Sequence, residues 1–355
     1  MKPLFYSFLL IGYITACGAT PTPPKSGQRA VLMNAEPNDP LKGQRPDPIV
    51  PITNVHEHMM GDSELEPLIA AMDTVGIERT VVLGSPIYTF KLGMNGFTEH
   101  DANNEAVLGL SQLEPDRIIP FVVIYPEDED APQKLQNYVA RGARGVKLFA
   151  GHGASHGHGP FHTMPLDDPR LTAVYDVIKE HNLPVLFHVN YAKFTDEFER
   201  VLTTNPTMKV LCPHFCLTLR DTRKVKSLLD RHPNLWMDVS FGWIQFQAEG
   251  YRRIDVKPET VRKVIEAHPD RFLYGTDLVL TDYENKDEEW ITMNMSFYRD
   301  LLERKTYSYY GLSGGPLTGL NLSETLLTGI YRDNATAWLE GLPVAPGTEA
   351  ENKEQ

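Results

Sequence analysis

Residues 49–58 read IVPITNVHEH, an apolar run that ends in two histidines one residue apart, His56 and His58. An extended strand alternates its side chains between two faces, so we expect both imidazoles on the same face. Two neutral imidazoles on one face suit a single metal ion. A strand end with two hydrogen-bonded histidines explains the same pattern, so the rest of the chain must decide between these interpretations.

Short β-branched and apolar runs recur along the chain and alternate with segments of helical spacing. With 49–58 they predict eight strands, the others at residues 79–84, 117–124, 143–149, 183–189, 209–215, 235–241 and 272–277. In the first helical segment Ser63 and Glu66 have capping-box spacing, and Gly76 is typical of a helix end. Eight repeated βα units predict a single-domain (β/α)8 TIM barrel, with a doubly wound sheet as the alternative.

The composition limits the classes of partner. The formal net charge of −13 argues against nucleic acid. No glycine-rich phosphate loop of the dinucleotide-binding or P-loop type occurs in the sequence. We expect the barrel to span residues 49–343 and to be followed by an acidic tail at 344–355, and we expect a small-molecule substrate. A homodimer is a reasonable default for such a barrel.

The N-terminal residues have the composition of an export signal. One lysine precedes an apolar stretch from Leu4 to Ile14, which is too short to span a bilayer as a helix. Residues 14–17, ITAC, resemble a bacterial lipobox, which implies a signal peptide at 1–16 and lipid attachment at Cys17. Residues 17–48 are rich in Pro and Gly and read as a tether. The resemblance implies a lipid-anchored envelope protein, with the outer membrane favoured because Gly18 is not aspartate.

Cys212 and Cys216 are the other two cysteines of the chain. On an extended strand their Cα atoms would lie about 13 Å apart, too far for a disulfide. We therefore expect buried thiols and no disulfide framework, with a Cys-x-His-x-Cys metal site as the alternative.

Polar residues stand at the same end of several predicted strands. His56 and His58 end the first strand, and the others are Lys147, His188, His214 and Asp277, near the ends of strands four, five, six and eight. In a TIM barrel the chemistry lies at the C-terminal ends of the strands. A buried unpaired imidazole or carboxylate costs several kcal/mol, so these groups are expected to satisfy one another or a cation. Together they favour the metal interpretation.

This ordered set resembles the amidohydrolase superfamily, closest to the amidohydrolase-related branch that includes the carboxymuconate-semialdehyde and resorcylate decarboxylases. The similarity covers almost the whole domain, through NVHEHM (54–59), GARGVKLF (142–149), LPVLFHVN (183–190), VLCPHF (210–215), DRFLYGTD (270–277) and IYRDNATAWL (330–339). It implies that a divalent metal, usually zinc, is bound by His56, His58, His188 and Asp277. It also implies that His214 acts beside the metal as an acid, base or polarising group.

The donor chemistry agrees with this resemblance. Imidazoles and a carboxylate suit zinc, with manganese or iron as alternatives. Such a cation would lower the pKa of water, after which Asp277 could move the proton and His214 could hold a developing oxyanion. Lys147 has two interpretations. A carbamylated Lys147 would bridge two metals, whereas an unmodified Lys147 would bind a substrate carboxylate or pair with Asp238; we favour the unmodified lysine and one metal.

Two further groups are candidates for substrate binding. The loop after the fourth strand contains His152, His156, His158 and His162 and is expected above the barrel mouth as a lid, a weak metal site or a plain surface loop. Arg252 and Arg253 follow the seventh strand and could hold an anionic substrate, although surface ion pairing explains them equally well.

The sequence therefore predicts a metal-dependent hydrolase that attacks an acyl C–N or C–O bond of a small molecule. A non-oxidative decarboxylase or hydro-lyase would use the same ligands and is the first alternative. A surface binding lipoprotein that kept the barrel and lost catalysis is the second, and the complete ligand set speaks against it.

Overall fold

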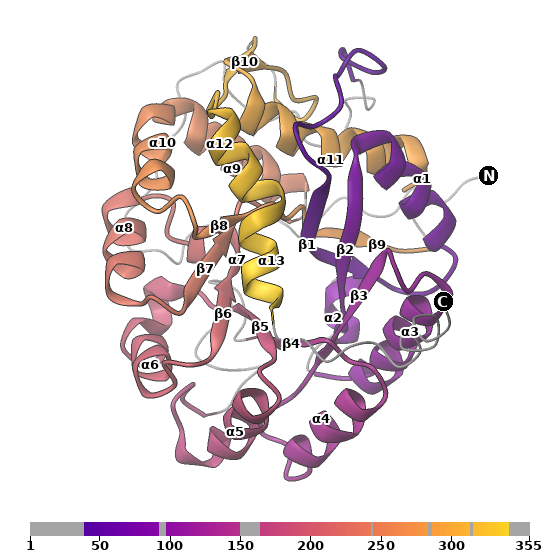
Figure 1. Cartoon of the computed structure of the whole chain (residues 1–355), viewed down its shortest axis with the longest axis vertical. Coiled ribbons are helices and arrows are strands. Elements are labelled where there is room, and N and C mark those ends of the chain that lie inside the picture. Colours follow the sequence, from indigo (N-terminus) through magenta and orange to yellow (C-terminus); the bar gives the residue numbers. More distant parts are fainter. Residues whose placement is uncertain are drawn as a thin grey trace, which may run out of the picture.

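The computed structural model describes residues 39–91, 97–149, 164–242, 244–282, 286–312 and 315–340. Nine parallel strands form one sheet in the order β8-β7-β6-β5-β4-β3-β2-β1-β9. Figure 1 shows these strands in the middle of the molecule with helices around them. The strands are β1 (Ile52–Met59), β2 (Ile77–Leu83), β3 (Ile118–Val123), β4 (Gly145–Phe149), β5 (Pro184–His188), β6 (Lys209–Cys212), β7 (Leu235–Asp238), β8 (Phe272–Leu273) and β9 (Leu278–Leu280).

The barrel closes because its eighth strand is broken into two pieces. β8 pairs with β7, and β9 pairs with β1. Between them, the Val55 amide donates to the Tyr274 carbonyl at 2.9 Å, and the Asp277 amide donates to the His56 carbonyl at 2.7 Å. The predicted single-domain (β/α)8 barrel is therefore confirmed, and the doubly wound alternative is wrong.

Helices follow the strands and pack their apolar faces on the sheet. In α1 (Leu65–Val75) the buried residues recur every three or four positions, and Gly76 ends the helix at φ 84°. The others are α2 (Ile87–Phe90), α3 (His100–Leu113), α4 (Ala131–Ala140), α5 (Thr172–Glu180), α6 (Tyr191–Thr204), α7 (Pro213–Cys216), α8 (Thr222–Arg231), α9 (Ile244–Val256), α10 (Pro258–Ala267), α11 (Glu288–Glu303), α12 (Glu324–Thr328) and α13 (Asn334–Leu339). Short 3₁₀ and π turns cover Pro169–Leu171 and Gly329–Asp333, and β10 (Thr306–Tyr307) pairs with β11 (Leu317–Thr318).

The predicted capping box at the start of α1 is wrong. The helix begins at Leu65, and its first turn has no side-chain cap. The Ser63 hydroxyl instead donates to Glu64 at 2.6 Å, and the Gly61 amide donates to the same carboxylate at 3.2 Å. The Ser63 hydroxyl therefore hydrogen-bonds the adjacent Glu64 carboxylate and does not cap the helix.

The barrel interior is apolar and is covered at one end by α13. Inward residues of the strands, such as Val55 and Phe121, form a buried cluster with Trp338 of α13. The Trp338 indole donates to the carbonyl of Lys209, where β6 begins, at 3.2 Å. Figure 1 shows α13 across the front of the strands. Because α13 closes the N-terminal ends of the strands, the C-terminal ends are left for the site.

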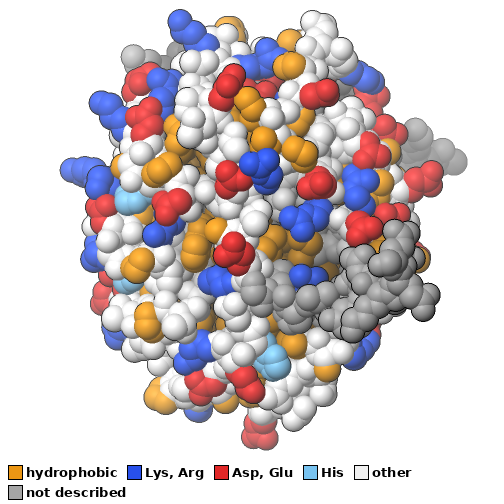
Figure 2. Space-filling model, viewed as in Figure 1, with side chains coloured by type: hydrophobic (Ala, Val, Ile, Leu, Met, Phe, Trp, Pro, Cys, Tyr) orange, Lys and Arg blue, Asp and Glu red, His pale blue; other side chains and the backbone are white. Residues whose placement is uncertain are grey.

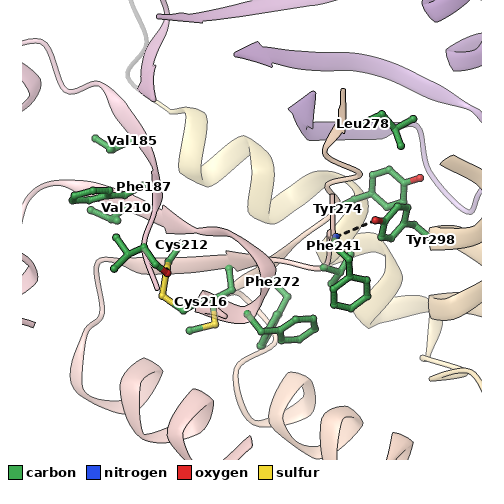
Figure 3. Packing of buried hydrophobic residues seen from close by; sticks show 14 of the residues in the cluster. Val185, Phe187, Val210, Cys212, Cys216, Phe241, Phe272, Tyr274, Leu278 and Tyr298 are labelled. Carbon is green, nitrogen blue, oxygen red and sulfur yellow. Dashed lines mark hydrogen bonds between the residues drawn. A yellow bond between two sulfur atoms is a disulfide. The ribbon is translucent and has the colours of Figure 1, made fainter. Parts of the chain in front are cut away.

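Cys212 and Cys216 form a disulfide with their Cα atoms 5.0 Å apart. Both side chains are labelled in Figure 3. The expectation of two free thiols, and the alternative of a metal site on them, are both wrong. Both assumed that the strand continued through residue 215. Instead β6 ends at Cys212, and His214, Phe215 and Cys216 have φ values of 59°, 52° and 54°. This left-handed turn brings the two cysteines together.

The last residues of the predicted tether, 39–48, lie against the barrel. The Arg45 guanidinium donates to both Asp39, at 2.6 Å, and Asp300 of α11, at 2.6 Å. The Arg299 side chain donates to the Pro46 carbonyl at 2.8 Å. These contacts attach residues 39–48 to α11. The predicted signal peptide, Cys17 and the predicted acidic tail lie outside the described residues. Among the described residues, no helix is long and apolar enough to span a membrane.

Candidate metal centre

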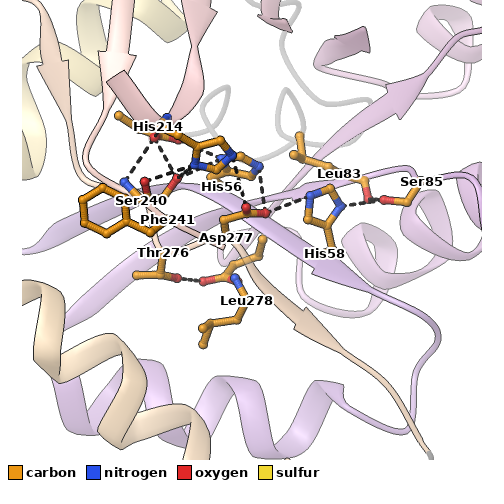
Figure 4. Close-up of polar contacts among 12 residues, drawn as sticks. His56, His58, Leu83, Ser85, His214, Ser240, Phe241, Thr276, Asp277 and Leu278 are labelled. Atoms are coloured by element: carbon orange, nitrogen blue, oxygen red, sulfur yellow. Dashed lines mark hydrogen bonds and ion pairs between the residues drawn. The ribbon is translucent and has the colours of Figure 1, made fainter. Parts of the chain in front are cut away.

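Three of the four predicted metal ligands meet at the C-terminal end of β1. His56 and His58 lie on one face of β1, as expected, with ring centroids 5.3 Å apart. The Asp277 Oδ1 atom lies 3.0 Å from His56 Nε2 and 3.1 Å from His58 Nε2. One ligand atom from each of the three residues lies within 4.8 Å of the others, and all three side chains are buried. Figure 4 shows the carboxylate directed between the two rings.

Asp277 takes this position through an unusual backbone. It lies in the break between β8 and β9 with φ 53°, a left-handed conformation that costs a non-glycine residue free energy. Glu57 supports both neighbours of Asp277: its carboxylate accepts the Thr276 hydroxyl and, at 2.8 Å, the Leu278 amide. Asn54 donates to the same carboxylate at 2.6 Å. Glu57 is thus a positioning residue that the sequence did not single out.

The approach to Asp277 also requires a glycine. Gly242 has φ 69°, and a Cβ atom placed there would lie 2.4 Å from Asp277 Oδ2. Any side chain at this position would therefore displace the carboxylate. The glycine follows β7 in the sequence, but only the fold shows that it faces Asp277.

Hydrogen bonds orient both histidines by their Nδ1 atoms. His56 Nδ1 lies 2.7 Å from Asp238 Oδ2, and His58 Nδ1 lies 2.6 Å from Ser85 Oγ. These contacts direct both Nε2 atoms towards Asp277. Asp238 also accepts the His214 amide at 2.8 Å and the Ser240 hydroxyl at 2.7 Å. A carboxylate behind a ligating imidazole is the usual partner that fixes its tautomer and orientation.

The charges favour ionised Asp277 and a neutral His58. Burial raises the pKa of Asp277, but His56, His58 and His214 outweigh it and hold that pKa well below the ordinary range. Burial lowers the pKa of His58 to about 4, and Asp277 offsets this only in part. His56 differs: burial lowers its pKa, whereas Asp277 and then Asp238 raise it above the ordinary value.

The geometry of His56 fits a cation. Its Nε2 atom is buried and has no hydrogen-bond partner in the described part of the chain, although Asp277 Oδ1 lies only 3.0 Å away. Two imidazole nitrogens and a carboxylate oxygen that converge on one point are the donor set of a divalent metal. The residues present therefore fit the group that the sequence implies.

His214 and His188 lie next to this triplet. His214 Nε2 is 3.4 Å from Asp277 Oδ2, and its Nδ1 lies 3.1 Å from the Ser240 carbonyl. A carbonyl only accepts, so Nδ1 carries the proton and Nε2 is free to accept one. Burial lowers the pKa of His214. His188, the fourth predicted ligand, ends β5 with its ring 5.1 Å from the ring of His214, and it is not in the close group of ligand atoms.

Lys147 is buried on β4 with 1% of its surface exposed. Its Nζ atom has no hydrogen-bond partner among the described residues and lies 5.7 Å from the centre of the Phe149 ring. The expected pair with Asp238 is not formed, because the Asp238 carboxylate is taken up by His56, the His214 amide and Ser240. Burial lowers the pKa of Lys147 to about 8, although the charges of Asp277 and Asp238 act against this.

The remaining candidates lie elsewhere. Arg252 and Arg253 are on α9, where both pair with Glu249, at 3.7 Å and 2.9 Å. Both arginines therefore have the ion pairing that was the alternative to substrate binding. His152 and the other loop histidines fall in residues 150–163, outside the described part of the chain.

A barrel with histidines and a carboxylate at the C-terminal strand ends is typical of metal-dependent enzymes. The particular family follows from the sequence. A family model for amidohydrolases matches residues 30–340, and the chain belongs to this family. No curated protein matches the chain.

Solved structures share the fold at low identity. A 2,6-dihydroxybenzoate decarboxylase from Rhizobium is 15% identical with a TM-score of 0.54, covering 82% of this chain and 98% of its own. A putative 2-pyrone-4,6-dicarboxylic acid hydrolase from Pseudomonas putida is 17% identical with a TM-score of 0.56, with the same coverage of 82% and 98%. A 5-carboxyvanillate decarboxylase from Sphingomonas paucimobilis is 10% identical with a TM-score of 0.52, covering 82% and 99%. At these identities the comparison supports the fold alone.

Proposed function

We propose that the chain is a metal-dependent hydrolase that cleaves an acyl C–N or C–O bond of a small molecule. The observation that carries the proposal is the convergence of His56 Nε2, His58 Nε2 and Asp277 Oδ1 in a buried site. A divalent metal held there, for which zinc is our first choice, would activate water at neutral pH and polarise the acyl oxygen.

The protein groups supply the proton transfers. Asp277 Oδ2 points away from the two ligating imidazoles and lies 3.4 Å from His214 Nε2, so a proton taken up by Asp277 has an acceptor within reach. His214 can then deliver the proton to a leaving group, or donate a hydrogen bond to a developing oxyanion. Asp238 holds His56 in place throughout, because its contact with Nδ1 is remote from the reacting atoms.

Non-oxidative decarboxylation is the second candidate. Lys147 favours it, since a buried amine without a hydrogen-bond partner is suited to binding a substrate carboxylate. Two of the similar structures are decarboxylases, and a 5-carboxyvanillate decarboxylase from Novosphingobium aromaticivorans, 12% identical with a TM-score of 0.50, is complexed with manganese. Manganese is therefore the main alternative to zinc.

One assay separates the two reactions. A panel of amides, lactones, esters and hydroxybenzoates is incubated with the metal-loaded protein in ¹⁸O-labelled water. A hydrolase incorporates one labelled oxygen into the product acid, and a decarboxylase releases carbon dioxide with no label in the remaining product. The Asp277→Asn variant is the control. Turnover by this variant at the parent rate would contradict the role proposed for Asp277. No turnover of any substrate by the metal-loaded parent would favour a chemically inert binding barrel.

A carbamylated Lys147 with a second metal is the remaining version of the site. The lowered pKa of Lys147, about 8, supports the neutral amine that carbamylation requires. Two metals per chain in the presence of bicarbonate, falling to one in Lys147→Met, would establish it. One metal per chain in both proteins supports the mononuclear site that we favour.

We also propose that the enzyme is exported and lipid-anchored through Cys17. Cys17→Ser should shift the protein from the detergent-soluble membrane fraction to the soluble fraction of the envelope. An unchanged distribution would contradict the anchor without affecting the proposed chemistry. A homodimer is expected as the default state and is tested by light scattering.

A further inference from the structure

A second pocket lies at the opposite end of the barrel from the metal centre. It has a volume of about 300 Å³ and is lined by Arg79 near the start of β2, by Ile118 and Ile119 of β3, by Arg144 just before β4 and by Leu339 of α13. These positions place it at the N-terminal strand ends, beside the helix that covers the barrel. Figure 2 shows this face, where basic, acidic and apolar side chains lie close together.

The two arginines of this pocket lack partners. The Nε atoms of Arg79 and Arg144 are buried without a hydrogen-bond partner, and neither side chain forms an ion pair within the described residues. Arg117 lies at the same end of the barrel and differs: its guanidinium donates to Asp73 at 2.6 Å and to the Glu78 carbonyl at 2.8 Å. Missing partners are therefore a property of this pocket and not of arginines at this end in general.

No acid neutralises the pair. Asp116 and Glu340 also line the pocket, but both are exposed and neither is ion-paired to Arg79 or Arg144 in the part of the chain that is described. Burial lowers the pKa of Arg144, and the positive charge of Arg79 lowers it further. Two guanidinium groups that repel each other beside an apolar wall are stabilised when an anion binds between them.

We propose that Arg79 and Arg144 form a binding site for the oxyanion of a phosphate or carboxylate group. The planar guanidinium donates two parallel hydrogen bonds to such a group, which a lysine cannot do. The apolar side of the pocket, formed by Ile118, Ile119 and Leu339, accommodates the remainder of a small organic anion. Two sources share this chemistry: a free small anion, and the carboxylates of Glu349, Glu351 and Glu354, which follow the described chain beyond Glu340.

The test is calorimetric titration of the full chain with inorganic phosphate at neutral pH and low ionic strength. Phosphate affinity is expected to fall at least about 100-fold in Arg79→Gln/Arg144→Gln, since each of the two lost bidentate contacts is worth roughly 1.4 kcal/mol or more. Arg117→Gln is the matched control and should bind phosphate like the parent. The His56→Ala/His58→Ala variant should also bind like the parent, which excludes phosphate bound at the metal centre.

Further variants protect the result against misfolding and identify the source of the anion. Arg79→Lys and Arg144→Lys keep the positive charge but lose the paired donors of the guanidinium, so both variants should bind phosphate with intermediate affinity. If a chain that ends at Glu340 binds phosphate several-fold more tightly than the full chain, the tail carboxylates compete for the site. Equal affinity identifies a free anion as the ligand. Equal binding by the double arginine variant, or no phosphate binding by either chain length, would overturn the proposal.

Discussion

The two ends of the barrel bury different kinds of side chain on the same strands. At the C-terminal end, β1, β7 and the break after β8 place His56, Asp238 and Asp277 in a buried polar cluster. At the N-terminal end, the Trp338 ring lies 5.4 Å from the ring of Phe121 and covers an apolar interior. One end therefore concentrates groups that are costly to bury, and the other supplies packing that offsets their cost.

The backbone shows the same division. A consecutive run of left-handed, non-glycine residues lies beside the metal centre, and Asp277 adds another: φ lies between 52° and 59° at His214, Phe215, Cys216, Leu217 and Asp277. Each such conformation costs on the order of 1 kcal/mol and persists only where the surroundings enforce it. Here the surroundings include the Glu57 carboxylate and the Cys212–Cys216 disulfide. The C-terminal end, here called the open end, is therefore built for geometry. The N-terminal end, which α13 covers and which we call the closed end, is built for stability.

The largest effect should come from removing a ligand at the open end. Asp277→Asn keeps the shape of the side chain but loses its charge and its capacity to take up a proton, so kcat/KM should fall roughly 10³-fold. Metal affinity, measured by competition with a chromogenic chelator, should fall with it. Asp116→Asn at the closed end is the matched control and should leave both values unchanged. A metal affinity that survives in Asp277→Asn would exclude this carboxylate as a ligand.

Truncation of a side chain at the closed end should lower stability and leave metal affinity unchanged. Trp338→Ala removes a fully buried ring of α13, the helix that covers the closed end, and should lower the free energy of unfolding by about 4 kcal/mol. Metal affinity of the folded fraction should stay within about twofold of the parent, because Trp338 contacts Phe121 and the start of β6, at the opposite end of the barrel from the ligands. Chemical denaturation and chelator competition measure the two values separately. A large loss of metal affinity would show that the two ends are coupled.

Burial of Lys147 at the open end should make the free energy of unfolding depend on pH. Its pKa is about 8 in the fold and 10.5 when exposed, so between these pH values the unfolded chain carries a proton that the folded chain lacks. The free energy of unfolding should therefore rise with pH from about 8 to 10.5, by up to about 3 kcal/mol.

Lys147→Met tests this directly in the metal-free protein. The variant should lose the rise above pH 8 and should be more stable than the parent at pH 7, because it buries no ammonium group. Lys134→Met, at a partly exposed position on α4, is the control and should keep the rise. Identical pH profiles for the parent and Lys147→Met would mean that Lys147 stays charged in the folded state.

The smallest effect on metal affinity is expected from the residues that hydrogen-bond the two histidine ligands. Asp238→Asn leaves His56 without its charged partner and should weaken metal binding about 10- to 100-fold. Ser85→Ala removes a neutral partner from His58 and should cost less. Titration with zinc in a competing buffer ranks the two variants. The reverse order would show that His58, not His56, depends more on its support.

Much of the open end could be predicted from the sequence because strand periodicity determines it. Once 49–58 reads as a strand, His56 and His58 must share a face, and the parallel arrangement brings the end of strand eight beside them. Asp277 was placed correctly for this reason. Arg252 and Arg253 were placed correctly in sequence after strand seven, but only the fold shows that both contact Glu249.

The parts that sequence reasoning missed depend on irregular backbone. Nothing in CPHFC marks three successive left-handed residues, so the disulfide was wrongly excluded. The same holds for the break that turns Asp277 inward and for Glu57, which appears in the sequence as an ordinary strand residue between two histidines. Asp238 was one of two possible partners for an unmodified Lys147, whereas three hydrogen bonds commit it to His56, His214 and Ser240.

The most direct test of the account is the metal content of the untagged protein from Asp39 onward, measured by elemental mass spectrometry. We predict about one zinc or manganese per chain in the parent, and near none in His56→Ala/His58→Ala, with Trp338→Ala retaining the parent value. A protein that binds no metal after dialysis against zinc and manganese, while folded by circular dichroism, would contradict the metal centre and the function built on it.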